Sequence, residues 1–257
     1  MSAALEIEAV ATAMHAIVDT SIERRSAAGY FAAMYLGVTR VVGAGLASGA
    51  FTTPERLANL TTVFAQRYLD AWRLHESGEP ISGAWQVAFV AGSRWRPTVL
   101  QHLLLGMNAH INLDLGIASA QVSPGAAITE LRADFDQINH ILAGLVSNIQ
   151  DELDHISPFY RFVSSVSGPV DRSVINFSIA RARDEAWKLA TFLAAAEPDV
   201  AAARIADQDR LTRVLGNAIM RPGAMAMTGL LAVRLTEKRH PVKIIDIISG
   251  AGAAAPP

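Results

Sequence analysis

One stretch, residues 96–118, constrains the fold more than any other part of the chain. Its sequence is RPTVLQHLLLGMNAHINLDLGIA, which is long enough for a helix and apolar around its whole circumference. A helix that is apolar on every side is buried on every side. We therefore expect an all-α protein, a multi-helix bundle built around a buried central helix over residues 97–118.

The same stretch carries polar side chains that a buried helix must satisfy. A buried polar group without a partner costs roughly 1–3 kcal/mol, so each requires a hydrogen bond, a charge partner or a metal. At about 100° per residue, His110 and Asp114 can touch at i and i+4, whereas Asn112 points away from them. His110 and Asp114 are the predicted catalytic pair, and His102, Asn108 and Asn112 are candidates for substrate binding.

The composition indicates a single apolar domain. Hydrophobic residues make up 51% of the 257 residues and charged residues 18%, with a mean hydropathy of +0.26. Because no linker or fixed-period repeat is visible, we predict one domain over residues 1–250, followed by a flexible tail over 251–257. The apolar periodicities predict about eight or nine helices, and strand signals are nearly absent.

Several classes of function and location are disfavoured by composition. The chain has no cysteine, which removes disulfides, thiol catalysis and cysteine-ligated metals, and its net charge of −2 gives no electrostatic footprint for nucleic acid. The N-terminus does not resemble a signal peptide, and no membrane span is expected, so we expect a cytoplasmic protein. The apolar excess and the alanine-rich helices after residue 186 favour a homodimer.

One cation falls within an apolar stripe. In the helix predicted over about residues 53–75, Arg67 shares the register of the inward face. A cation there needs a counter-charge. Two interpretations remain open. In the first, Arg67 snorkels or forms a structural salt bridge. In the second, it faces the same interior as Asp114 or Asp134 and helps to hold a ligand.

The longest predicted helix, over about residues 126–156, also directs polar groups toward the interior. Asp134 and Asn139 flank its apolar seam about 7.5 Å apart along the axis. They are candidate substrate-binding residues, and separate interhelical hydrogen bonds would explain them equally well. His140 and His155 point away from the seam and are predicted to be exposed.

Two other groups of side chains are interpreted as structural. Trp85 and Phe89 lie at i and i+4 on a short helix, which is typical of a core pair, with ligand lining as the alternative. The charge run at Arg181, Arg183, Asp184 and Glu185 is typical of a solvated face.

A resemblance to a known family agrees with these expectations. The motif QHLLLGMNAHINLDLGIA, together with FAQRYLDAW, DFDQINHIL and ARDEAW, resembles an uncharacterised, largely bacterial family classed as a domain of unknown function. The likeness covers most of residues 27–195. It implies a single helical domain and no particular substrate.

The predicted pair favours an enzyme acting on a small, largely apolar substrate. His110 would be the general base or acid, because a neighbouring carboxylate sets the tautomer of an imidazole and raises its basicity. Arg67, Asp134 and Asn139 would position the substrate. In a variant of this hypothesis, His110, Asp114 and Asp134 are ligands of a divalent metal between facing helices.

Two other classes of function remain open on the sequence. The apolar composition would suit a non-catalytic binder of an apolar small molecule. A structural or interaction protein is the third class, with buried His, Asn and Asp residues that fix the register of its helices. The sequence contains no dinucleotide-binding, phosphate-binding or HExxH motif that would identify a reaction.

Overall fold

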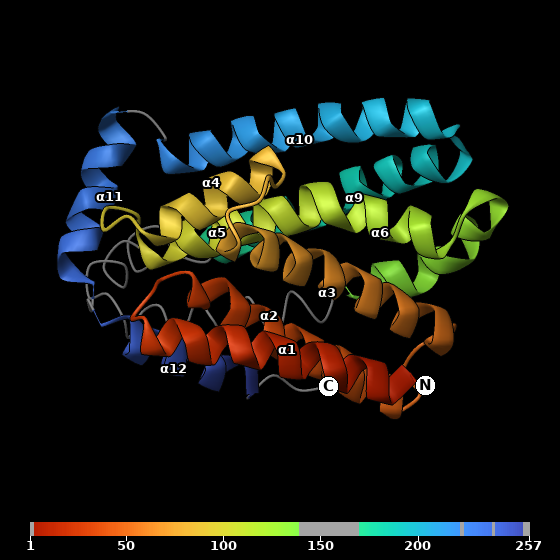
Figure 1. Ribbon diagram of the computed structural model, residues 1–257, viewed down its shortest axis with the longest axis horizontal. Helices are drawn as coiled ribbons and strands as arrows, with labels where there is room; N and C mark the ends of the chain where they lie inside the picture. Colours follow the sequence, from red (N-terminus) through yellow and green to blue (C-terminus); the bar gives the residue numbers. More distant parts are fainter. Residues whose placement is uncertain (1–2, 139–169, 222–223, 238–239, 254–257) are drawn as a thin grey trace.

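The computed structural model describes residues 3–138, 170–221, 224–237 and 240–253 (Figure 1). Within these ranges the regular elements are ten α-helices, one π-helix and one 3₁₀-helix, with no strand, and they form one compact domain. The all-α prediction is confirmed. More helices occur than the eight or nine expected, partly because the apolar C-terminal stretch forms a full helix that reaches Ala253.

The elements follow the chain in three groups. The N-terminal helices are α1 (Ala3–Glu23), α2 (Gly29–Ala47), α3 (Pro54–Glu76) and α4 (Gly83–Gly92). The next three form one continuous rod: α5 (Val99–Ala109), the π-helix η1 (His110–Asp114) and α6 (Leu115–Val122). The 3₁₀-helix η2 (Gly125–Leu131) precedes α9 (Val170–Ala195), α10 (Pro198–Met220), α11 (Ala224–Thr236) and α12 (Pro241–Ala253).

The rod of α5, η1 and α6 is the central helix that the sequence predicts. It begins at Val99, because Thr98 is the N-cap and forms a reciprocal capping box with Gln101, and it extends to Val122. The predicted start at residue 97 was therefore two residues early and the predicted end four residues short. Helices α2, α3, α4, α9 and α10 pack around the rod (Figure 1).

Helix α2 corrects one expectation from the sequence. Over Gly29–Ala47 it is long and apolar enough to cross a membrane by length and composition, although no such stretch was expected. Core helices of soluble proteins pass the same test, and 72% of the window is buried within the fold. In this structure α2 packs between α1 and α12 and contributes Tyr30, Phe31 and Tyr35 to the core.

The segment after the rod was predicted to be a single long α-helix over residues 126–156, but its first residues form a 3₁₀-helix. Gly125 has a φ of 61°, and residues 125–131 form the 3₁₀-helix η2. Three residues per turn place Ile128 and Leu131 on one side, and both are buried. Residues 132–138 are α-helical. The predictions for Asn139, His140 and His155 lie outside the described residues.

Candidate active site

The π-helix η1 carries the sequence HINLD and interrupts the middle of the rod. Its first and last residues are His110 and Asp114, whose side chains are 3% and 2% exposed. The Nδ1 atom of His110 lies 3.6 Å from Oδ2 of Asp114, which is too long for a good hydrogen bond but close enough for the carboxylate to favour the protonated imidazole. Single π-turns within α-helices are frequent at functional sites.

Asp114 is held by two donors from neighbouring helices. The Nε of Arg67, on α3, donates to Oδ1 at 2.8 Å, and the indole Nε1 of Trp85, on α4, donates to Oδ2 at 2.8 Å. The contact between Arg67 and Asp114 is one of the alternatives that the sequence left open. The role of Trp85 was missed, because its register with Phe89 predicts a core aromatic and says nothing about where the indole N–H points.

Aromatic rings surround His110. Its imidazole stacks on Phe64 with the ring centroids 3.5 Å apart and the planes 7° from parallel, and the ring of Tyr35 lies 4.3 Å away. Phe31, Trp85 and Tyr68 complete this shell at centroid distances of 5.7, 6.0 and 6.4 Å.

Both nitrogens of His110 lack a hydrogen-bond partner within the described part of the chain. Burial lowers the pKa of His110 below its usual value; Asp114 opposes this shift and Arg67 adds to it. The imidazole is therefore neutral at pH 7. The hydroxyls of Tyr35 and Tyr68 are also buried without a partner there, and burial raises the pKa of both phenols.

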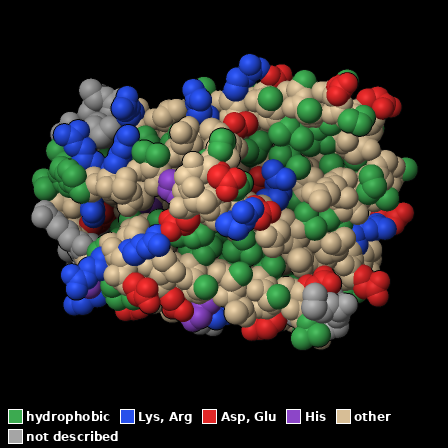
Figure 2. All heavy atoms as spheres, in the orientation of Figure 1, with side chains coloured by type: hydrophobic (Ala, Val, Ile, Leu, Met, Phe, Trp, Pro, Cys, Tyr) green, Lys and Arg blue, Asp and Glu red, His purple; other side chains and the backbone are tan. Residues whose placement is uncertain are grey.

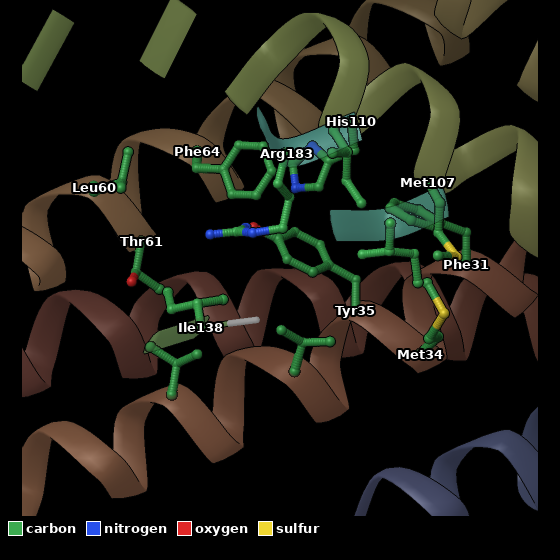
Figure 3. Close-up of a pocket in the computed structure, with 14 residues that line it drawn as sticks. Phe31, Met34, Tyr35, Leu60, Thr61, Phe64, Met107, His110, Ile138 and Arg183 are labelled. Carbon is green, nitrogen blue, oxygen red and sulfur yellow. The ribbon is translucent and has the colours of Figure 1, made fainter. Parts of the chain in front are cut away.

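His110 lines an apolar cavity of about 80 Å³ between α2, α3, the rod and α9 (Figure 3). Most of the lining is aliphatic or aromatic: Phe31, Met34, Tyr35, Val38, Val42, Leu60, Thr61, Phe64, Met107, His110, Ile111, Ile138, Ile179 and Arg183. A mostly apolar lining with a few polar groups is typical of small-molecule sites, and the volume here is well below the roughly 300–1,000 Å³ of sites for drug-sized ligands.

Arg183 corrects the interpretation of the charge run on α9. We expected a solvated face, whereas Arg183 is 3% exposed and its side chain lies in the cavity (Figure 3). A sequence signal was present: Arg183 falls in helical register with Ile179, Ala186 and Ala190, all of which are buried. The rest of the run behaves as expected, since Arg181, Asp184 and Glu185 are exposed.

Three predicted substrate-binding residues of the rod have other partners. Asn108 donates to the carbonyl of Thr212 on α10 at 2.9 Å and accepts from Asn112 at 3.0 Å. Gln208 of α10 donates to the backbone carbonyl of Asn112. His102 is buried with its ring edge-on to Tyr30 and does not line the cavity. These side chains hold the rod against α10 and α2 and do not line the cavity at His110.

Asp134 lies away from His110 and Asp114. Its carboxylate accepts hydrogen bonds from the backbone N–H groups of Thr52 and Thr53, at 2.7 and 2.6 Å, and from the Thr53 hydroxyl. It therefore caps the N-terminus of α3 and neither positions a substrate at the cavity nor joins a metal site with the pair. No group of three His, Asp or Glu side chains placed to hold a metal ion occurs among the described residues.

The fold and site define an all-α protein with a buried His–Asp pair beside a small apolar cavity. The chain belongs to the family of unknown function DUF5995, whose model matches residues 7–222. The resemblance seen in the sequence is thereby confirmed, and every residue of the site lies within the matched range. No curated protein and no solved structure matches the chain.

Proposed function

We propose that this protein is an enzyme that acts on a small, largely apolar substrate, with His110 as its general base. One observation carries the proposal: His110 is buried and neutral, lines the cavity, and has neither nitrogen bound by another described residue. A polar group left unsatisfied in a core costs roughly 1–3 kcal/mol. A fold that keeps such a group beside a cavity provides a base for a bound molecule.

Asp114 supports this role of His110 in two ways. Its carboxylate lies nearest to Nδ1, which favours the tautomer with the proton on that atom and leaves the Nε2 lone pair free to accept a proton. When His110 accepts a proton, Asp114 stabilises the imidazolium that forms. Arg67 and Trp85 fix the carboxylate in place, so both act as positioning residues.

The apolar lining supports the proposal because it keeps water away from the imidazole of His110. Phe64 and Tyr35 cover the imidazole from α3 and α2, and Met107 of α5 lines the same cavity. In such a setting the electrostatic effect of Asp114 on the imidazolium is stronger than in water. A neutral imidazole in this shell is a base at neutral pH without competition from solvent.

The first prediction concerns His110→Gln, an amide that keeps much of the shape of the imidazole but cannot transfer a proton. We expect turnover to fall at least about 100-fold, since general-base catalysis contributes roughly 10²–10⁴-fold. The measurement is the consumption of compounds from a cellular metabolite extract, followed by mass spectrometry, with the wild-type chain and the variant in parallel. Melting temperatures establish that both chains are folded.

A matched control is His102→Gln, which changes the other buried histidine of the rod, outside the cavity. Compounds consumed by the wild type should also be consumed by His102→Gln. Turnover at the wild-type rate by a folded His110→Gln chain would remove His110 from the mechanism.

The non-catalytic binder remains the second candidate, because apolar side chains form most of the cavity lining. It predicts a different result in the same experiment. The wild-type chain would then retain a compound from the extract without converting it, and His110→Gln would retain it as well.

A further inference from the structure

Arg183 is a buried cation whose hydrogen bonds are incomplete. Its NH2 group donates to the backbone carbonyl of Phe135 at 2.5 Å, and its guanidinium lies 4.3 Å from the centre of the Phe135 ring. Its Nε has no partner in the described part of the chain. A charged guanidinium in a core normally has a carboxylate bound to its donors, because burying a charge without one is costly.

Among the residues that the structure describes, the groups near Arg183 do not provide that carboxylate. No carboxylate of the described residues lies within ion-pair distance of its guanidinium. The acids whose charges act on it, Asp136 and Asp184, are both ion-paired with Arg132, at 2.6 and 3.6 Å. Burial lowers the pKa of Arg183 to about 10, so the side chain is still charged at pH 7.

The described lining of the cavity therefore combines one charged group with mostly apolar side chains. Arg183 is the one side chain charged at neutral pH among the described residues that line it, and Figure 3 shows its guanidinium reaching across the pocket toward Thr61. The volume of about 80 Å³ is smaller than a cavity of about 150 Å³ that holds benzene. A fitting ligand is accordingly small, carries a single negative charge and is otherwise apolar.

We propose that the cavity takes a short-chain aliphatic monocarboxylate, whose carboxylate pairs with Arg183 and whose hydrocarbon chain lies against the apolar side chains. A guanidinium matches a carboxylate with two parallel N–H donors, and Nε is one of the atoms that can provide them. As the substrate class of the enzyme proposed above, this inference rests on that proposed function. It places the charged end of the ligand at Arg183 on α9, in the same cavity that His110 lines.

The test is calorimetric binding of butyrate and of its neutral analogue butyramide to the full chain. We expect butyrate to bind the wild type at least about tenfold more tightly than butyramide, since a hydrogen bond to a charged group contributes more than a neutral one. Arg183→Met should weaken butyrate binding by at least about tenfold. The matched control is Arg181→Met, which removes an exposed arginine of the same helix and should bind butyrate as the wild type does.

The binding and turnover results distinguish a failure of the carboxylate assignment from a failure of His110 as the base. Equal binding of butyrate and butyramide, no binding of butyrate to the wild type, or unchanged binding by a folded Arg183→Met chain would each overturn the carboxylate assignment. The first two results do not require any variant to fold. Charge-selective binding through Arg183, together with unchanged turnover by His110→Gln, would support the ligand class and refute the role of His110 as the base.

Discussion

Burial controls the protonation of both histidines in the central rod. It lowers the pKa of His102 to about 4, with a smaller effect of the same sign from Arg234. It also lowers the pKa of His110, although the neighbouring carboxylate of Asp114 opposes it. Both imidazoles are therefore neutral in the folded protein at pH 7. For His110 the neutral state is the one that a base needs. For His102 the neutral state is the one that the folded protein favours, so protonating it costs stability.

Stability is therefore expected to fall as the pH is lowered from about 6.5 to about 4. In this range the unfolded chain binds a proton on His102, whose unfolded pKa is 6.5, and the folded chain does not. The contribution of His102 is fully present above pH 6.5, and about 3 kcal/mol is lost by pH 4. Urea unfolding at pH 7 and pH 5 should show a smaller decrease for His102→Gln than for the wild type. The control for the substitution itself is His15→Gln, at a side chain that is 57% exposed, which should change the stability at pH 7 by less than about 0.5 kcal/mol.

The N-termini of three helices are capped by carboxylates that are far away in sequence. Asp134 accepts from Thr52 and Thr53 at the start of α3, and Asp209 of α10 accepts from Gly83 and Ala84 at the start of α4. Glu237 accepts from the backbone N–H of Val99, the first residue of the rod. A carboxylate satisfies free backbone donors and complements the positive end of the helix dipole. These bonds fix the ends of the elements that carry Arg67, Trp85 and His110.

Asp134→Ala tests this capping on α3. We expect a loss of about 2 kcal/mol of unfolding free energy, because a cap is removed and the backbone N–H groups of Thr52 and Thr53 lose their acceptor. Asp136→Ala is the matched control; it removes a half-exposed, ion-paired acid two residues away and should cost less than about 0.5 kcal/mol. Urea denaturation at pH 7 measures both. Equal losses would contradict the capping role.

The acid dependence of the same variant provides a second check. Burial alone would raise the pKa of Asp134, but the hydrogen bonds from Thr53 and Thr52 outweigh it and lower the pKa below 3.8. The stability that Asp134 contributes is therefore present above about pH 3.8 and is lost as the pH falls below it. Asp134→Ala should show a shallower loss of stability in that acid range.

The molecule also exposes an apolar surface on its C-terminal half. On α10, Leu211 and Val214 are 61% and 66% exposed, and Val200 and Leu215 are about half exposed. Figure 2 shows apolar side chains gathered on this face, over the region where α9 and α10 run in Figure 1. Large exposed apolar patches on soluble proteins mark interaction sites. The homodimer expected from composition stays a prediction, and α10 is the helix that we expect to form it.

Light scattering should give a mass near twice the 27.4 kDa of the chain. The double variant Leu211→Lys and Val214→Lys places two charges in the predicted interface and should give the monomer mass while the chain stays folded, since both side chains are exposed on the single chain. A wild-type mass of 27.4 kDa across a wide range of concentrations would contradict the prediction.

The helical fold and the central pair were predictable because both depend on local spacing. Apolar residues at helical intervals indicate an α-helix. A helix that is apolar on every side must be covered by other helices on every side, so it lies at the centre of the bundle. His110 and Asp114 meet because positions four apart share one side of a helix, and they remain close within the π-turn that the sequence did not predict.

The rest of the site depends on which helices lie side by side. Arg183 lies 73 positions after His110 in the sequence, and both line the cavity only because α9 packs against the rod. The same applies to Trp85 at Asp114 and to Asp134 at the start of α3. Helical periodicity indicates which side of each helix is buried, but the partner of a buried polar group is chosen by the packing of all the helices together, since every charge and donor in the core must be satisfied at once.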